Sequence, residues 1–257
     1  MEVHHHTHTN PAHRETSRKK FTHYIWEFLM LFLAVFCGFL AENFREHLID
    51  HRREIQYMKS MLSDLSNDTT QLGMQEETLI ERWTACDSIS YYLKSGNIKN
   101  FGSEIYYYGR IIGFYNYRRS LASRTLDQLK SAGMFRLIQD LIVADSILKY
   151  DEEKKEYETS IAKLFDEIKN IQQVNKLLFD TKIFEAATEY TSRFNYKPLK
   201  PLGNPVLLNY ETNFLQRYYN DVYYLKRITE GCLRSLYNCR QMNKSLAETI
   251  EKEYHLK

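Results

Sequence analysis

The hydrophobic pattern is dominated by a run of fourteen residues, Phe28–Ala41 (FLMLFLAVFCGFLA), without a charged or strongly polar side chain. The apolar character begins earlier, so that the 18 residues of Tyr24–Ala41 contain a single charge, Glu27. A helix of this length measures roughly 27 Å at about 1.5 Å per residue, which is close to a hydrocarbon thickness of about 30 Å. The pattern predicts a membrane-spanning helix within residues 22–43.

Two other interpretations of this run fit less well. A cleaved signal peptide needs small residues before its cleavage site, whereas Phe39 precedes Ala41, and a lipoprotein signal needs Gly or Ala where Phe36 precedes Cys37. A buried helix of a soluble domain carries its apolar residues on one stripe, whereas here they surround the helix. We therefore expect an uncleaved anchor.

Beyond the apolar run, the hydrophobic positions continue in alternating steps of four and three, the spacing of a heptad repeat. Gly73 is the one strong helix weakener within it. The pattern predicts that the helix continues past the membrane with a coiled-coil-like seam, whose polar members specify register. The seam consists of Phe44, Leu48, His51, Ile55, Met58, Leu62, Leu65, Thr69, Leu72, Glu76, Leu79, Trp83, Cys86, Ser90 and Leu93.

The remaining sequence predicts further helices and few other elements. A turn is expected from Gly96 to Ser103, with Ser103 capping the next helix, and a short helix is expected over 123–133. Two long helices are expected over about 140–180 and about 207–253, separated by a Pro-rich loop. We predict an all-α fold, in which residues 44–257 form one elongated, antiparallel helical-bundle domain after the transmembrane helix.

Composition agrees with helices and excludes some functions. The chain of 257 residues has only 9 Gly and 4 Pro, and its 35 Lys and Arg nearly balance 33 Asp and Glu, for a net charge of +2. No global field would attract nucleic acid, so we expect no nucleic-acid partner. A disulfide joining Cys86 to Cys232 or Cys239 is left open, because three cysteines outside the span cannot all pair within one chain.

Basic residues flank the apolar run on both sides. Four precede it and three follow it; the preceding group is largely free of acidic residues next to the membrane, whereas Glu42, Glu46, Asp50 and Glu54 are interleaved with the following group. Because cytoplasmic flanks carry an excess of Lys and Arg, we expect the N-terminus in the cytoplasm and the large domain outside it. The preceding residues are Arg14, Arg18, Lys19 and Lys20, and the following ones are Arg45, Arg52 and Arg53.

Histidines offer candidate metal ligands at two places. Residues 1–21 are expected to form a flexible, basic tail, in which His4, His5, His6 and His8 could capture a transition metal, since imidazole is a common ligand. Alternatively, the tail is simply polar. His47 and His51 lie four apart and share a helix face, but a third ligand is missing locally, so a solvated face is the favoured interpretation.

Other polar residues of interest have structural explanations. Glu27 lies about one turn from the end of the span and is expected to reach the interface. A cluster of aromatic and basic residues resembles sugar-binding or nucleic-acid-binding surfaces, although bundle packing is favoured. Catalytic triads and nucleotide-binding or metalloprotease motifs are absent from the sequence, so we expect no enzyme activity and no cofactor. The cluster contains Tyr106, Tyr107, Tyr108, Tyr115, Tyr117, Arg118 and Arg119.

Several segments together resemble a known family. The anchor leads directly into Glu42-Asn43 and a charged helix, which is followed by Leu62-Ser63-Asp64-Leu65; later, the segment 125–133 (TLDQLKSAG) precedes Leu137-Ile138. With the His-rich opening, these segments resemble a family of single-span proteins from Bacteroidota. The resemblance covers the first 150 residues and implies an envelope location. This family has no assigned activity, so the resemblance implies no catalytic residue.

The sequence thus favours a non-enzymatic, single-pass protein of a bacterial inner membrane with a periplasmic helical domain. Its expected partners are the lipid bilayer and either further copies of itself or another membrane protein, which the domain would scaffold. The alternative is an extracytoplasmic ligand-sensing module, which would need a partner protein to transmit its signal because only 23 residues precede the span.

Overall fold

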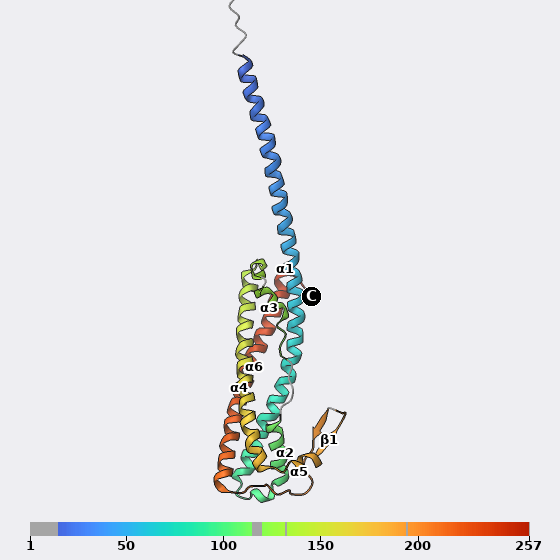
Figure 1. The fold of residues 1–257 in the computed structure, drawn as a ribbon, viewed down its shortest axis with the longest axis vertical. Coiled ribbons are helices and arrows are strands. Elements are labelled where there is room, and N and C mark those ends of the chain that lie inside the picture. The colour runs from blue at the N-terminus through green and yellow to red at the C-terminus, as the bar shows by residue number, and fades with distance from the viewer. Residues whose placement is uncertain (1–14, 115–119, 132, 194, 257) are drawn as a thin grey trace, which may run out of the picture. The chain divides into compact units, whose positions relative to one another are not determined.

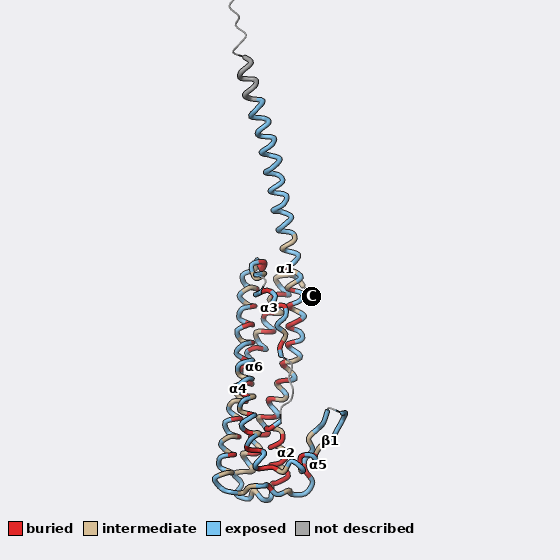
Figure 2. The backbone as a smooth tube through the Cα atoms, viewed as in Figure 1, coloured by how far each residue is buried: buried red, intermediate tan, exposed pale blue. Residues whose placement is uncertain are grey.

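The structure is a computed structural model, and it describes residues 15–114, 120–131, 133–193 and 195–256, with side chains from residue 23 onward. The chain divides into two compact units, Met1–Ile55 and Gln56–Lys257. The helix α1 (Glu15–Lys94) contributes to both. In the first unit, the described side chains of α1 are exposed until residue 48, as the pale blue part of the tube shows (Figure 2). The apolar run lies within this exposed part.

The second unit is a helical bundle. Three long helices lie side by side, namely the C-terminal part of α1, α4 and α6, while α2, α5 and a small hairpin gather at one end (Figure 1). The all-α prediction is confirmed at this level. The elements after α1 are η1 (Ile98–Asn100), α2 (Gly102–Gly113), α3 (Arg124–Ser131), η2 (Met134–Leu137), α4 (Leu141–Leu178), α5 (Thr181–Ala186), β1 (Thr188–Tyr190), β2 (Tyr196–Pro198) and α6 (Thr212–Glu253).

Local signals explain most helix ends. Asp140 caps α4 by accepting hydrogen bonds from the backbone N–H of Ile142 at 2.7 Å and of Val143 at 3.1 Å. Gly96 follows α1 and Gly133 follows α3 with φ of 72° and 61°, a conformation that costs glycine little. The predicted cap at Ser103 is wrong: α2 begins at Gly102, and the Ser103 hydroxyl instead donates to the carbonyl of Pro201 at 2.6 Å.

All three long helices carry buried residues along the bundle (Figure 2), and these residues recur at heptad spacing. In α4 and α6 the buried series include Tyr150, Tyr157, Leu164, Ile171 and Leu178, and Tyr218, Leu225, Cys232, Cys239 and Leu246. Alternating steps of three and four keep one face of a helix turned toward its neighbours. In α1 the buried series is Met58, Met61, Leu65, Asp68, Leu72, Gln75, Leu79, Arg82, Cys86 and Ile89.

The predicted seam in α1 matches this series at every second member. Met58, Leu65, Leu72, Leu79 and Cys86 are buried as expected. The intervening members lie one residue earlier than predicted: Met61, Asp68, Gln75, Arg82 and Ile89 are buried, whereas Thr69 is exposed and Leu62, Glu76, Trp83 and Ser90 are half-buried. Three of these buried side chains are polar, so a hydrophobic pattern could not identify them.

The helix directions differ from the predicted antiparallel arrangement. Hydrogen bonds join Asp68 to Tyr150 and Gln75 to Tyr157, so the numbers rise together and α4 runs parallel to α1. The chain therefore returns along the bundle through the short elements between residues 98 and 138, before α4 begins.

The helix α6 runs in the opposite direction to α1 and packs along α4. Thr69 bonds to Asn243 at 2.8 Å, while Asp87, further along α1, pairs with Lys226, which is earlier in α6. The helix begins at Thr212, five residues later than predicted, because the preceding segment is held against α4: the N–H of Leu208 donates to the carbonyl of Leu178 at 2.9 Å.

One end of the bundle is closed by aromatic packing and a glycine contact. Tyr106, fully buried, packs against Phe179 and Phe184 with ring centroids 4.9 and 5.5 Å apart. A Cβ atom at Gly109 would lie 2.3 Å from the Phe179 ring, so only glycine allows α2 to approach this closely. The antiparallel pair β1–β2, with Thr188 opposite Pro198, was not predicted.

Candidate functional site

The apolar part of α1 is the first candidate site. Every residue of Tyr24–Ala41 is exposed, including Phe28 at 68% and Leu31 at 69%. Among the described residues, this is the one helix that is long and apolar enough to cross a membrane. Leu, Met, Phe and Ala form helices readily, and the single glycine, Gly38, is insufficient to break the helix.

The one charge within this segment has a local partner. Glu27 lies 3.1 Å from the imidazole of His23, one turn earlier, and both side chains are more than half exposed. An interaction with a partner toward the N-terminus directs the carboxylate away from the middle of the apolar run. This geometry agrees with the expected interfacial position of Glu27.

The structure does not assemble a metal site from the predicted histidines. His4, His5, His6 and His8 lie outside the described residues, so their role stays a prediction. His51 lies 3.3 Å from Glu54, and no group of three potential ligands among His, Cys, Asp and Glu occurs within the described ranges. His47 and His51 are both exposed, and the described residues place no third ligand beside them.

The structure describes only some members of the aromatic and basic cluster. Tyr106 is part of the bundle core, where its hydroxyl accepts the N–H of Asp180 at 2.9 Å and donates to the carbonyl of Val206 at 3.1 Å. This residue therefore packs the bundle, as favoured. Four members of the cluster, Tyr115, Tyr117, Arg118 and Arg119, lie outside the described residues.

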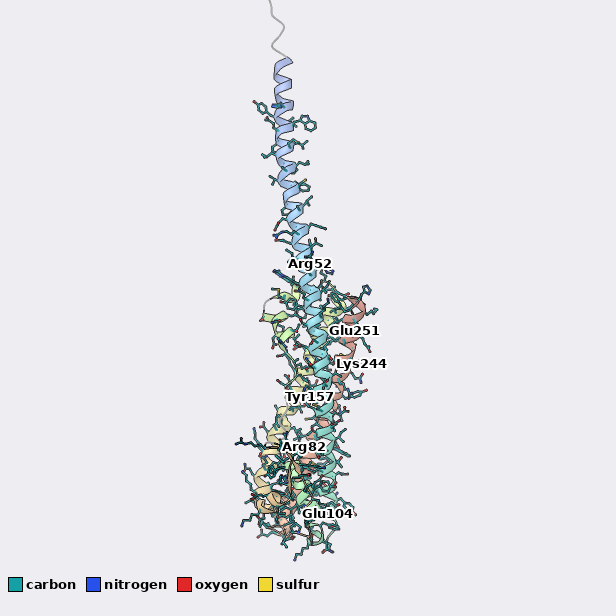
Figure 3. The ribbon with its side chains drawn as sticks, turned by 90° about the vertical axis from the view of Figure 1, so that its right-hand side faces the viewer. Arg52, Arg82, Glu104, Tyr157, Lys244 and Glu251 are labelled. Carbon is teal, nitrogen blue, oxygen red and sulfur yellow. The ribbon has the colours of Figure 1, made fainter. Side chains whose placement is uncertain are left out.

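A polar ladder inside the bundle is the second candidate site, and the sequence pattern missed it. Its members on α1 are Asp68, Gln75 and Arg82, each seven residues from the next and at most 6% exposed. Gln75 accepts a hydrogen bond from Tyr157 of α4, and Arg82 donates to the carbonyl of Phe114 at 2.9 Å. Tyr157 and Arg82 are labelled in Figure 3. The ladder joins α1 to α4 and to the end of α2.

Asp68 joins the ladder to α4 and to the segment that precedes α3. Its carboxylate accepts the hydroxyl of Tyr150 at 2.6 Å and the backbone N–H of Ala122, while Lys154 donates to the carbonyl of Ala122 at 2.7 Å. Desolvation raises the pKa of the Asp68 carboxyl, and the hydrogen bonds oppose this effect. The same burial and the nearby carboxylate raise the pKa of Tyr150 far above its usual range. The bonds of Asp68 and Lys154 to Ala122 hold the segment around Ala122 between α1 and α4.

Three of the four cysteines lie in the core of the bundle. Cys86, Cys232 and Cys239 are buried and no disulfide joins them, so none of the disulfides left open by the sequence is present. Burial raises the pKa of the Cys86 and Cys239 thiols to about 12. Such thiols are inert at neutral pH because the reactive form is the thiolate.

Comparison with known proteins adds no identification: no family model, no curated protein and no solved structure matches this chain. The resemblance to a family from Bacteroidota therefore stays a prediction.

Proposed function

We propose that this chain is a non-enzymatic, single-pass membrane protein whose helical domain mediates self-association or scaffolds envelope partners. The observation that carries the proposal is the exposure of every side chain from Tyr24 to Ala41, of which only Glu27 is charged. The run Phe28–Ala41 contains nine Leu, Phe and Val residues. At about 0.3–0.6 kcal/mol each, they favour insertion into lipid by about 3–5 kcal/mol.

The outer surface of the bundle supports a role in assembly. The heptad faces of the three long helices are buried within the chain, so a partner would contact the remaining surfaces. On α6, the side chains of Tyr223, Tyr224 and Tyr237 are 49%, 62% and 59% exposed. Tyrosine is enriched at protein interfaces because its ring buries apolar area while its hydroxyl bonds to polar groups. We propose that these tyrosines contact a second copy or a partner protein.

We further propose a bacterial inner-membrane location, with the N-terminus in the cytoplasm and the bundle in the periplasm. The four basic residues before the span are the first support. The second is that Arg45 pairs with Glu42 at 2.5 Å and Arg53 with Asp50 at 3.5 Å, so two of the three cations after the span are neutralised locally.

Crosslinking in intact membranes tests self-association. A lysine-reactive reagent should trap dimers or larger species of the wild-type chain, and the double variant Tyr223→Ser/Tyr224→Ser should reduce their yield. Tyr190→Ser is the control, because Tyr190 is also exposed, at 68%, but lies in the hairpin. Detection of monomer alone in wild-type membranes would count against self-association, and co-purification in mild detergent would then test for scaffolding of another protein.

A new surface cysteine tests the topology. Because the thiols of the bundle are buried, Lys244→Cys, at a side chain 74% exposed, should be the one group there that reacts quickly with a membrane-impermeant maleimide. Spheroplasts should be labelled without lysis, whereas Thr9→Cys in the N-terminal tail should be labelled only after permeabilisation. The reverse labelling pattern would mean that the proposed orientation is wrong.

The second candidate function is ligand sensing through a partner protein. One observation favours it: a cavity of about 530 Å³ lies beside the turn that follows α1.

A further inference from the structure

The cavity beside the turn has the size of a small-molecule site. Its volume is about 530 Å³, and it lies between the end of α1, η1 and the first turns of α6. Ligand pockets in proteins usually measure about 300–1,000 Å³. Its walls combine apolar, aromatic and polar side chains, including Leu93, Lys94, Lys99, Tyr210, Thr212 and Tyr219.

The charge on the walls is positive. Lys94 and Lys99 are the two ionised groups that line the cavity, and no carboxylate lines it. The ammonium of Lys94 lies 5.1 Å from the ring centroid of Tyr219, and that of Lys99 lies 5.5 Å from the ring centroid of Tyr210. Neither lysine forms an ion pair with a carboxylate of the described chain. Lys94 interacts with the side chain of Tyr219 and, more weakly, with the charge of Asp87, but no carboxylate is paired with either lysine, so both can contact an anion.

Other lysines near this end of the bundle behave differently. Lys200 pairs with Glu104 at 2.6 Å, and Lys226, which lies over a tryptophan ring, also pairs with Asp87 at 2.6 Å. A lysine that stacks on an aromatic ring thus still takes a carboxylate partner where one is near. At these two lysines, unlike at Lys94 and Lys99, a carboxylate lies within ion-pair distance.

Hydrogen-bond donors complement the two cations. The hydroxyl of Tyr210 accepts the backbone N–H of Leu207 at 3.0 Å, which leaves its own proton free to donate. Thr212 is the first residue of the 42-residue helix α6, and the preceding Glu211 makes no side-chain capping hydrogen bond. The backbone N–H groups of this first turn are therefore further donors beside the lysines.

We propose that this cavity binds a small organic anion, namely a carboxylate or phosphate group on a compact skeleton with a sugar or apolar face. Lys94 and Lys99 meet the charge, and the aromatic and aliphatic walls contact the skeleton. The ligand class deepens the sensing alternative, on which its biological meaning rests. Binding itself requires neither the membrane anchor nor self-association, so its failure is distinguishable from theirs.

Isothermal titration of the full chain in detergent tests the proposal. The probes are inorganic phosphate, glucose 6-phosphate, glucuronate and, as the neutral control, methyl glucoside. We expect saturable binding of at least one organic anion, weakened by added salt because surface charges are screened, and none of methyl glucoside. Preference for glucose 6-phosphate or for glucuronate identifies phosphate or carboxylate as the bound group.

The variants make the test specific. Lys94→Gln/Lys99→Gln should weaken binding by at least about tenfold. The control Lys149→Gln/Lys169→Gln removes the same charge from exposed helix positions outside the cavity, and it should leave binding unchanged. The cavity lysines are exposed, so circular dichroism should show both double variants folded. Absence of saturable binding at about 10 mM of every anion, or equal binding by the two double variants, would overturn the proposal.

Discussion

Replacing Tyr150 by phenylalanine tests whether the polar ladder stabilises the bundle. Tyr150 is 2% exposed and donates its hydroxyl to the carboxylate of Asp68 at 2.6 Å, and Asp68 itself is 1% exposed. Tyr150→Phe removes one oxygen atom and keeps the buried ring. The hydrophobic burial is therefore nearly unchanged, and the measured effect reports the hydrogen bond and the carboxylate left without it.

The expected loss follows from ordinary hydrogen-bond energies. Removing the donor of a hydrogen bond to a buried charged group costs about 1.5–3 kcal/mol, and Asp68 keeps its hydrogen bond from the N–H of Ala122. We expect Tyr150→Phe to lower the free energy of unfolding by about 2–3 kcal/mol. For a domain of about 200 residues, each kcal/mol shifts the melting temperature by about 2–4 °C. The predicted fall is thus about 4–12 °C.

The assay is a thermal melt of the full chain in detergent, followed by near-ultraviolet circular dichroism at matched scan rates. The control is Tyr237→Phe, at a tyrosine of α6 that is 59% exposed. A surface change of this kind stays within about 0.5 kcal/mol, or about 2 °C. Equal melting temperatures for the two variants would refute the reasoning. So would a double-mutant cycle of Tyr150→Phe with Asp68→Asn in which the two effects simply add.

The pH dependence supplies an independent check. Desolvation raises the pKa of Asp68 in the folded chain above its value of about 3.9 in the unfolded chain. The folded state therefore holds this proton more tightly, so the contribution of Asp68 to stability is greatest below the unfolded pKa and is lost as the pH rises through the folded pKa. Relative to Asp68→Asn, the wild-type chain should become less stable as the pH rises above about 4. A constant difference would contradict this assignment.

Two further predictions concern backbone packing and thiol chemistry. Gly109→Ala places a Cβ atom 2.3 Å from the Phe179 ring and should destabilise the bundle by about 1–3 kcal/mol. Gly231→Ala, in open space within α6, should instead stabilise the bundle by about 0.5–1 kcal/mol. Thermal melts that rank the two variants in the other order would contradict the packing at α2. The buried thiols, with raised pKa values, should react with a maleimide only as fast as the bundle unfolds. Mass spectrometry of the labelled chain across a denaturant series measures this rate. Rapid labelling of Cys86 in the native state would contradict its burial.

The sequence predicted the long helices because apolar residues mark their buried faces. The ranges of α4 and α6 agree with the pattern to within a few residues, and Met58, Leu72 and Leu79 are buried where the heptad spacing put them. The other half of the series was displaced by one residue, because Asp68 and Gln75 are buried through partners on α4 that are 82 residues away. A local pattern cannot reveal such partners.

The direction of α4 was mispredicted for a related reason. The return path is made of short elements whose positions depend on single long-range bonds, such as that from Ala122 to Asp68. The cavity beside the turn also escaped sequence analysis, since Lys94 and Tyr219 are far apart in sequence and meet only because α6 runs opposite to α1.

Extraction of cell membranes with alkaline carbonate tests the central claim most directly. The account predicts that the full chain stays in the pellet and is released only by detergent. Val35→Arg, which puts a charge costing about 2.5–3.5 kcal/mol at the middle of the apolar run, should move part of the chain to the supernatant, whereas Val35→Leu should not. Release of the wild-type chain by carbonate alone would contradict membrane anchoring by residues 24–41.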